Sequence, residues 1–287
     1  EFDVDIRVGD AALDNTHEFK GDQAYTNSKR QASGSVPLED DADAIRSKLW
    51  VLTDLAYKGA LDQYAKVKMN KTVTAEEEDK SEDFSASSPA EFYERAAFPE
   101  FDREKLKAML RRLSEKLKGC DFIYDSNLGF SVWTTNRYMV NSEGSSIVAG
   151  NTYVRLRYSL SSRTDDGMDL DRFRSYDSDA VSGMPAEEAV SRDIDESVRE
   201  LKALRAVPAS EPYSGPAILE SRAAGVFFHE IFGHRAEGHR QKSESSGQTF
   251  TKKVGQSIMP AFLTVYDDPT LREFGGRFLR GYYRYDD

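Results

Sequence analysis

Cysteine is nearly absent from the sequence. The 287 residues include one cysteine, Cys120, so no disulfide can form within the chain. A chain without disulfides fits a reducing compartment, which favours a cytoplasmic location. The sequence starts at Glu1 rather than Met, so we expect a processed or incomplete N-terminus, and an exported origin stays open. Cys120 itself we interpret as a buried apolar thiol.

Long apolar runs and excess basic charge are also missing. No stretch approaches the roughly 18 apolar residues that a membrane-spanning helix needs, so we expect no membrane partner. Lys and Arg number 39 against 50 Asp and Glu, for a net charge of −11. Because phosphate binding depends on Lys and Arg, we expect no nucleic-acid partner. Hydrophobic residues at 39% and charged residues at 31% are typical of a globular protein.

The remaining pattern predicts an α+β fold. Apolar residues recur at helical spacing over about 41–69, 102–118 and 186–206. Between 121 and 162 lie runs rich in aromatic and β-branched residues, with plausible turns at NSEG and AGNT, which indicate antiparallel sheet. We therefore expect an N-terminal domain over 1–206, in which helices pack on an antiparallel sheet.

Proline marks the expected domain boundary. The segment VPASEPYSGP, 207–216, holds three prolines and two serines and is the best linker candidate. We expect 217–287 to be the start of a β-rich C-terminal domain, cut short at its end. Its first elements are predicted to be a short strand, AILE, and a helix that carries HEIFGH, 229–234.

The spacing within HEIFGH raises a question about metal binding. Zinc peptidases commonly carry His-Glu-x-x-His on a helix, with the glutamate as general base. Here His229 and His234 are five residues apart, which separates them by about 140° around a regular helix. A π turn would bring them together, or the helix ends at Gly233 and His234 turns back from a loop.

Two interpretations of this segment stay open at the level of residues. In the chemical one, Glu230 is a general base and the neighbouring apolar residues Phe227, Phe228, Ile231 and Phe232 lower the local dielectric constant. In the structural one, the segment is an apolar core helix whose histidines serve packing and the helix C-terminus.

A family resemblance favours the chemical interpretation. The run GVFFHEIFGHRAEGHR resembles the signature of the TldD/PmbA family of metallopeptidases, whose catalytic member carries His-Glu-x-x-x-His. NRYMVNSEG, GPAILESRAAG, VYDDPT and GYYRYDD resemble further strands and turns of that family, so the likeness covers about 120–287. The resemblance implies that His229 and His234 bind zinc and that Glu230 is the general base. It further implies hydrolysis of short or unfolded peptides, within a homo- or heterodimer with a related subunit.

One departure from the family concerns the third metal ligand. In the family this ligand is a cysteine far downstream of the motif, whereas Cys120 precedes it. A catalytic zinc site needs three protein ligands, so we expect either that the sequence stops before this ligand or that a substitute takes its place. His239 is the first candidate, followed by Glu237 and Glu244. The alternative functions are a non-catalytic binding or scaffold subunit of a TldD/PmbA-like complex, and a regulator acting through nucleic acid, which the charge disfavours.

Overall fold

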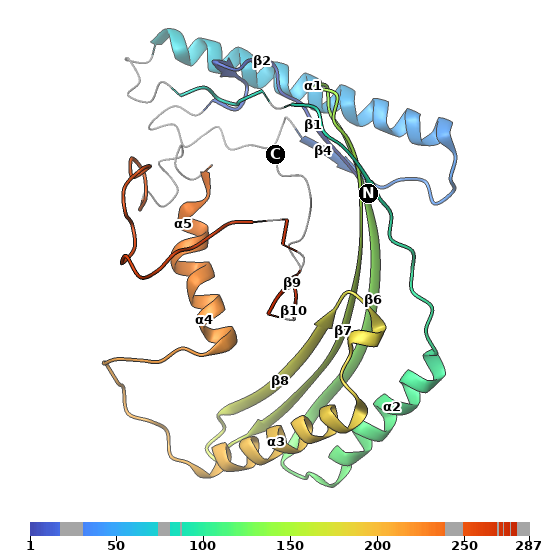
Figure 1. Ribbon diagram of the computed structural model, residues 1–287, viewed down its shortest axis with the longest axis vertical. Coiled ribbons are helices and arrows are strands. Elements are labelled where there is room, and N and C mark those ends of the chain that lie inside the picture. The colour runs from blue at the N-terminus through green and yellow to red at the C-terminus, as the bar shows by residue number, and fades with distance from the viewer. Residues whose placement is uncertain are drawn as a thin grey trace. The chain divides into compact units, whose positions relative to one another are not determined.

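The protein folds as two compact units, shown here as a computed structural model (Figure 1). One unit comprises 1–86 and 216–265, and the other comprises 87–215 and 266–287. The α+β class expected from the sequence is confirmed. The structure describes residues 1–17, 31–73, 81–86, 88–238, 249–268, 270–271, 273–275 and 277–279.

A four-stranded, curved sheet forms the centre of the second unit. Its strands are β5 (Glu91–Glu94), β6 (Ile123–Val140), β7 (Ser146–Arg163) and β8 (Asp169–Ser178). β7 pairs antiparallel with β6 along its length, and on its other edge it pairs antiparallel with β8 and parallel with β5. The expected antiparallel sheet is thus present, with a parallel edge strand that the sequence did not reveal.

The predicted turn at NSEG is confirmed, because it connects β6 to β7. The predicted turn at AGNT is wrong, since β7 runs straight through it. Gly150 lies opposite Asn136, whose side chain hydrogen-bonds the backbone N–H and C=O of Ala96 at 2.8 and 3.0 Å. A Cβ atom at position 150 would lie 2.0 Å from the Ala96 nitrogen. This glycine therefore allows a close backbone approach rather than a turn.

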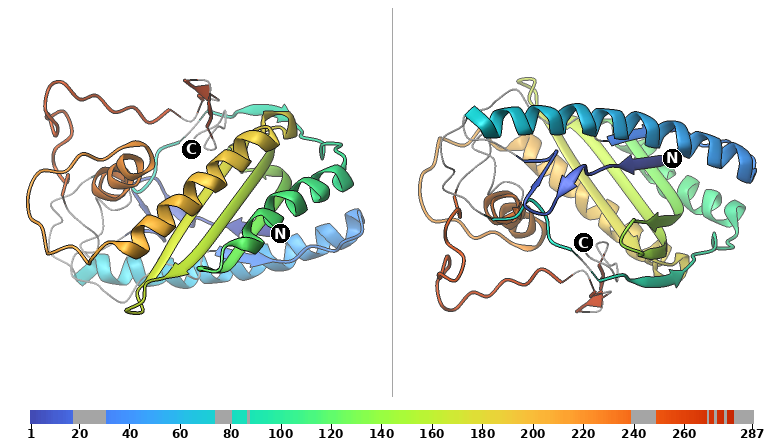
Figure 2. Two further views of the ribbon diagram at one scale, coloured as in Figure 1. Left: turned by 90° about the horizontal axis from the view of Figure 1, so that it is seen from below. Right: turned by 90° about the horizontal axis from the view of Figure 1, so that it is seen from above.

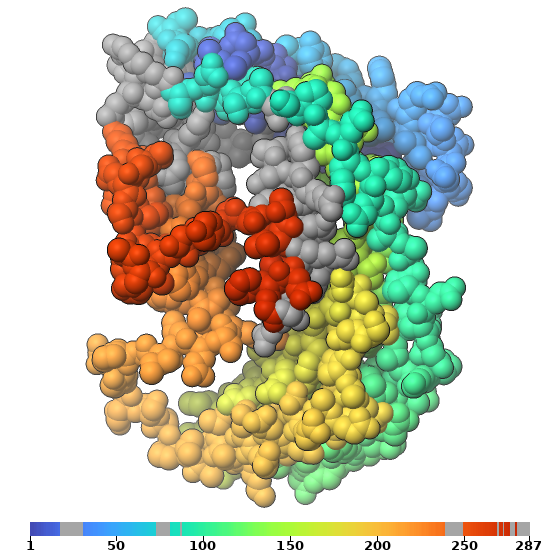
Figure 3. Space-filling model, in the orientation of Figure 1, coloured from blue at the N-terminus to red at the C-terminus, as the bar shows by residue number. Residues whose placement is uncertain are grey.

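Helices α2 (Arg103–Glu115) and α3 (Glu187–Ala206) lie side by side on one face of this sheet (Figure 2). Their side chains adjoin in the space-filling view, α2 in green and α3 in yellow (Figure 3). Asp102 is the N-cap of α2, because its side chain accepts a hydrogen bond from the Lys105 N–H at 2.9 Å. A 3₁₀ turn, Lys116–Gly119, ends the first of the two helices.

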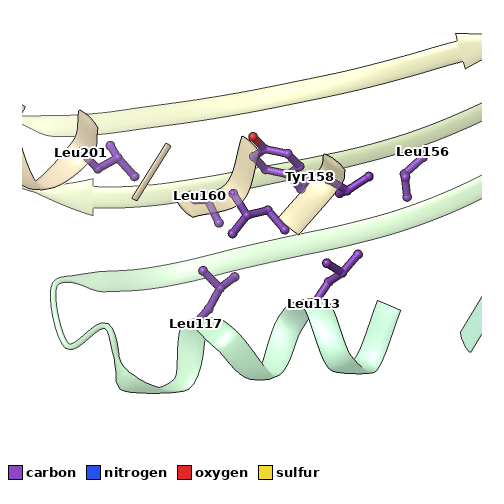
Figure 4. Close-up of a cluster of buried hydrophobic side chains, with 8 residues drawn as sticks. Leu113, Leu117, Leu156, Tyr158, Leu160 and Leu201 are labelled. Atoms are coloured by element: carbon purple, nitrogen blue, oxygen red, sulfur yellow. The ribbon is translucent and has the colours of Figure 1, made fainter. Parts of the chain in front are cut away.

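The main hydrophobic core lies between these helices and the sheet. Leu113 of α2 and Leu117 of the 3₁₀ turn point toward the strands (Figure 4). The cluster consists of Leu113, Leu117, Leu156, Tyr158, Leu160, Val190, Ile194 and Leu201. Its helical members follow the periodicity that predicted the two helices.

The first unit has small sheets and one long helix. Strand β1 (Phe2–Asp5) pairs antiparallel with β4 (Gln31–Gly34), and β2 (Gly9–Asp10) pairs with β3 (Leu13–Asp14). Helix α1 (Ala42–Val73) contacts β1 and β4, which confirms the predicted helix. The apolar residues at helical spacing over 41–69 mark the buried face only in part, because Leu49 and Leu61 among them are exposed. The buried positions are Leu52, Ala56, Ala60 and Val67.

The segment after α3 differs from its prediction in one respect. The described residues of 207–216 form neither helix nor strand, and the domain boundary placed there stays a prediction. The predicted strand at AILE is wrong, since 217–220 pair with no strand. Farther along, β9 (Glu273–Phe274) and β10 (Arg277–Phe278) form an antiparallel pair. Within the described residues, none of the helices combines the length and the apolar character that crossing a bilayer requires.

Candidate metal centre

The HEIFGH segment lies on a helix with a π turn in its middle. Helix α4 (Ser221–Phe228) continues through the π turn (His229–Gly233) into α5 (His234–Ala236), as one coiled ribbon in Figure 1. The His234 N–H donates to the carbonyl oxygen of His229, five residues earlier. Of the two alternatives that the spacing left open, the π turn is therefore confirmed. An end of the helix at Gly233 is wrong, because helical geometry continues to Ala236.

The π turn brings the motif side chains together. The ring centroids of His229 and His234 are 4.4 Å apart, with their planes at 67°. The Glu230 carboxylate reaches both rings: one oxygen is 3.9 Å from His229 Nε2 and the other is 4.0 Å from His234 Nε2. One ligand atom from each of the three residues lies within 4.8 Å of the others, so the group could hold a metal ion. No second group of this kind occurs among the described residues.

The second ring nitrogen of His234 has a different neighbour. Its Nδ1 atom lies 2.9 Å from a carboxylate oxygen of Glu237, which follows the last residue of α5. Glu237 was expected as a substitute metal ligand, yet it contacts the opposite side of the ring. Its spacing of three residues from His234 is the signal that could have revealed this contact, because such residues are neighbours on a helix. The other substitute candidates, His239 and Glu244, lie outside the described residues.

The candidate site is open to solvent. The side chains of His229 and Glu230 are 62% and 61% exposed, and that of His234 is 37% exposed. The expected apolar wall is only partly present, because Phe227, Phe228 and Ile231 are exposed. Phe232 is half-buried, with its ring centroid 5.7 Å from that of Phe250. No residue of α4, the π turn or α5 is buried, so the part of the chain that the structure describes does not pack around this segment as around a core helix. The motif side chains are therefore accessible at the surface of this helix.

Cys120 does not join this group in the described part of the chain. It follows the 3₁₀ turn, where its N–H donates to the carbonyl oxygen of Leu117 at 3.0 Å. Its thiol is free and the residue is half-buried, rather than fully buried as expected.

Comparisons with known proteins point to one family. Residues 212–287 match the PmbA/TldA metallopeptidase C-terminal domain, and this match includes the whole motif helix. A metalloprotease of Methanothermobacter thermautotrophicus is 30% identical over 160 residues, which are 54% of this chain and 34% of that protein. A metalloprotease of Archaeoglobus fulgidus is 39% identical over 72 residues, 24% of this chain and 16% of the relative. A metalloprotease of Methanocaldococcus jannaschii is 36% identical over 89 residues, which are 31% of this chain and 18% of that protein.

These matches cover only part of each relative. The chain spans about a third of the length of the Methanothermobacter protein and less of the other two. No solved structure matches the chain at a significant level.

Proposed function

We propose that the chain is a catalytic member of the TldD/PmbA family, which hydrolyses peptide bonds with the help of a zinc ion. One observation carries the proposal: the π turn gathers two imidazoles and a carboxylate whose ligand atoms lie within 4.8 Å of one another. Packing does not bury these side chains, so their polar atoms are available for chemistry at the surface of the helix.

The donor set fits a zinc ion. Imidazole nitrogens and carboxylate oxygens are common zinc ligands, and His229 and His234 would hold the ion through their rings. When bound, zinc would acidify a water molecule and polarise the scissile carbonyl group. A catalytic zinc site has three protein ligands and one open position. For the third ligand we propose His239, five residues after His234 in the sequence.

Glu230 is proposed to be the general base. Its two carboxylate oxygens lie within 4.0 Å of the two ring nitrogens, so a water molecule between the rings would be within its reach. The carboxylate would take a proton from the attacking water and return it to the leaving amine. Its 61% exposure leaves room for a peptide to approach.

Substrate and partner are proposed from the family. We propose short or unfolded peptides as substrates, because an extended chain can reach motif side chains that lie on an exposed helix face. We propose a homo- or heterodimer with a related subunit as the working assembly. Because the chain has a net charge of −11, we do not propose nucleic acid as a partner.

Elemental analysis combined with three variants tests this function. We expect about one zinc per parent chain, and loss of that zinc in both His229→Ala and His234→Ala. Glu230→Gln should keep the zinc, because the glutamate is not proposed as a ligand. Hydrolysis of an unstructured peptide should fall by roughly 10²- to 10⁴-fold in this variant, the usual contribution of a general base.

Two results would contradict the proposal. Chelator-sensitive hydrolysis that is unchanged in Glu230→Gln would remove Glu230 from its role. A folded parent chain without zinc would favour the alternative, a binding or scaffold subunit in which the helix has no metal.

A further inference from the structure

We propose that Glu237 is a positioning residue that decides which nitrogen of His234 faces the metal. The inference rests on the proposed function, since it concerns the same site. It adds a role for a residue that the sequence offered only as a possible ligand.

The two nitrogens of the His234 ring face different groups. Nε2 points to the motif side, 4.0 Å from Glu230, while Nδ1 lies 2.9 Å from Glu237. The side chains of His234 and Glu237 are 37% and 35% exposed, so their contact is partly shielded from water. The backbone leaves the helix at Glu237, with φ −57° and ψ 125°. The contact therefore joins the last helical turn to the first residue beyond it.

Because of the chemistry of imidazole, the contact with Glu237 favours one tautomer of the His234 ring. A neutral ring carries a proton on one nitrogen and a lone pair on the other. An ionised carboxylate only accepts hydrogen bonds, so Glu237 favours the tautomer with its proton on Nδ1. The lone pair of His234 is then on Nε2, directed toward His229 and Glu230. Carboxylates that hold a metal-binding histidine in this manner also raise the basicity of the ligand nitrogen.

His229 provides an internal comparison. Its ion-pair contact is with Glu230 and is made by Nε2, at 3.9 Å, whereas the carboxylate of Glu237 meets Nδ1 of His234. The proposed effect should therefore be specific to His234. A general effect of acidic charge on the helix would alter both rings.

The first test is nuclear magnetic resonance of the metal-free chain, labelled with ¹⁵N in its histidines. At about pH 8.5 an ordinary histidine ring is neutral, and long-range ¹H–¹⁵N correlations report its tautomer. We expect the proton of His234 on Nδ1 in the parent chain. Glu237→Ala should remove this preference, and Glu237→Gln should keep most of it, because an amide oxygen also accepts a hydrogen bond.

The second test is zinc affinity by competition with a chelator. Glu237→Ala should weaken zinc binding 10- to 100-fold, the usual effect of removing such a partner, and Glu237→Gln should weaken it less. Glu220→Ala is the matched control, because it removes the same charge from the start of the same helix, where the side chain makes no capping hydrogen bond. Its affinity should equal that of the parent. Circular dichroism of each variant would identify any loss of the helix itself.

Either of two outcomes would overturn the inference. One is a His234 ring in the parent chain with its proton on Nε2. The other is a Glu237→Ala variant whose tautomer and affinity match those of Glu220→Ala. A parent chain that binds no zinc would count against the proposed function instead, while the tautomer of His234 would still decide the role of Glu237.

Discussion

Replacing Asp193 with Asn should destabilise the second unit by about 2 kcal/mol at neutral pH. Asp193 lies on α3, and its carboxylate joins the helix to β8. It accepts a hydrogen bond from the hydroxyl of Tyr176 and pairs with Arg174 Nη1 at 2.7 Å. Burial, followed by the neighbouring carboxylate, raises the pKa of Tyr176, so the phenol stays a donor.

The magnitude follows from what Asn keeps and what it loses. A hydrogen bond to a charged group contributes about 1.5–3 kcal/mol, and a neutral one about 0.5–1.5 kcal/mol. The amide oxygen introduced by Asp193→Asn would still accept, so each of the two contacts loses the difference, on the order of 1 kcal/mol. The Arg174 side chain is 39% exposed, and solvent screening lowers its share. The sum is about 2 kcal/mol.

The sign of the pH dependence follows from the pKa of Asp193. Burial raises this pKa, but the hydrogen bonds from Tyr176 and Arg174 outweigh that effect, so the folded-state pKa lies below the ordinary value. A lowered folded-state pKa means that the carboxylate stabilises the fold fully above its unfolded pKa of about 3.9. The contribution is lost as the pH falls through the folded-state pKa. The difference between parent and Asp193→Asn should therefore be constant from about pH 7 to 5 and shrink below about pH 4.

Urea unfolding followed by tryptophan fluorescence measures this difference. Trp133 lies on β6 of the second unit and stacks on Tyr153, whereas Trp50 lies on α1 of the first unit. A Trp50→Phe background therefore restricts the signal to the sheet. Asp195→Asn is the matched control, because Asp195 pairs with Lys116 at the surface and its loss should cost about 0.2–1 kcal/mol. Equal costs for the two Asp→Asn changes, or a cost for Asp193→Asn that does not shrink as the pH falls below about 4, would refute the reasoning.

Two further predictions concern the packing of the same unit. Leu113, 1% exposed within the core cluster, should cost about 3 kcal/mol in the free energy of unfolding when replaced by Ala, and a cost under about 1 kcal/mol would contradict its central place in the core. Gly150→Ala should cost about 1–3 kcal/mol, because the new Cβ would displace the backbone of Ala96, while Gly129→Ala, whose Cβ meets nothing closer than 3.9 Å, should be nearly neutral by the same urea measurement.

Helices were the part of the fold that the sequence predicted best. The three long helices lie where apolar residues follow a helical period in the sequence. The stripe on α1 was only partly identified, because small residues fill the contact. Ala56 and Ala60 are fully buried, whereas Leu49 and Leu61 are not. Periodicity locates a buried face, but the width of the neighbouring surface decides which side chains it covers.

The strands were harder to predict, because the pairing of a strand depends on residues that are far away in the sequence. Strand β8 shows little apolar alternation, and ion pairs hold it to its neighbours, such as Arg155 with Asp177 and Arg172 with Glu200. Strand β5 pairs in parallel with a segment more than fifty residues away in the sequence. Gly150 resembles a turn residue in isolation, and only the approach of Ala96 shows why a glycine is needed within a strand.

The candidate site was predicted in its residues but not in its geometry. The sequence named His229, Glu230 and His234, and their spacing allowed either a π turn or a terminated helix. That choice depends on backbone hydrogen bonds, and the bond from His234 to His229 decides it. The contact of Glu237 with His234 was missed because a carboxylate near two histidines suggests a ligand before it suggests a support.

The π turn is itself an argument for a function at this site. Such turns are rare within helices and occur often at functional sites. A helix can tolerate one for packing, when a neighbouring surface requires a shifted residue, but none of the side chains from Ser221 to Ala236 is buried here. What the turn does achieve is to place the His229 and His234 rings 4.4 Å apart, where a regular helix would separate them by about 140°. The five-residue spacing, which at first counted against a metal site, is therefore the spacing that lets a π turn bring the two rings together.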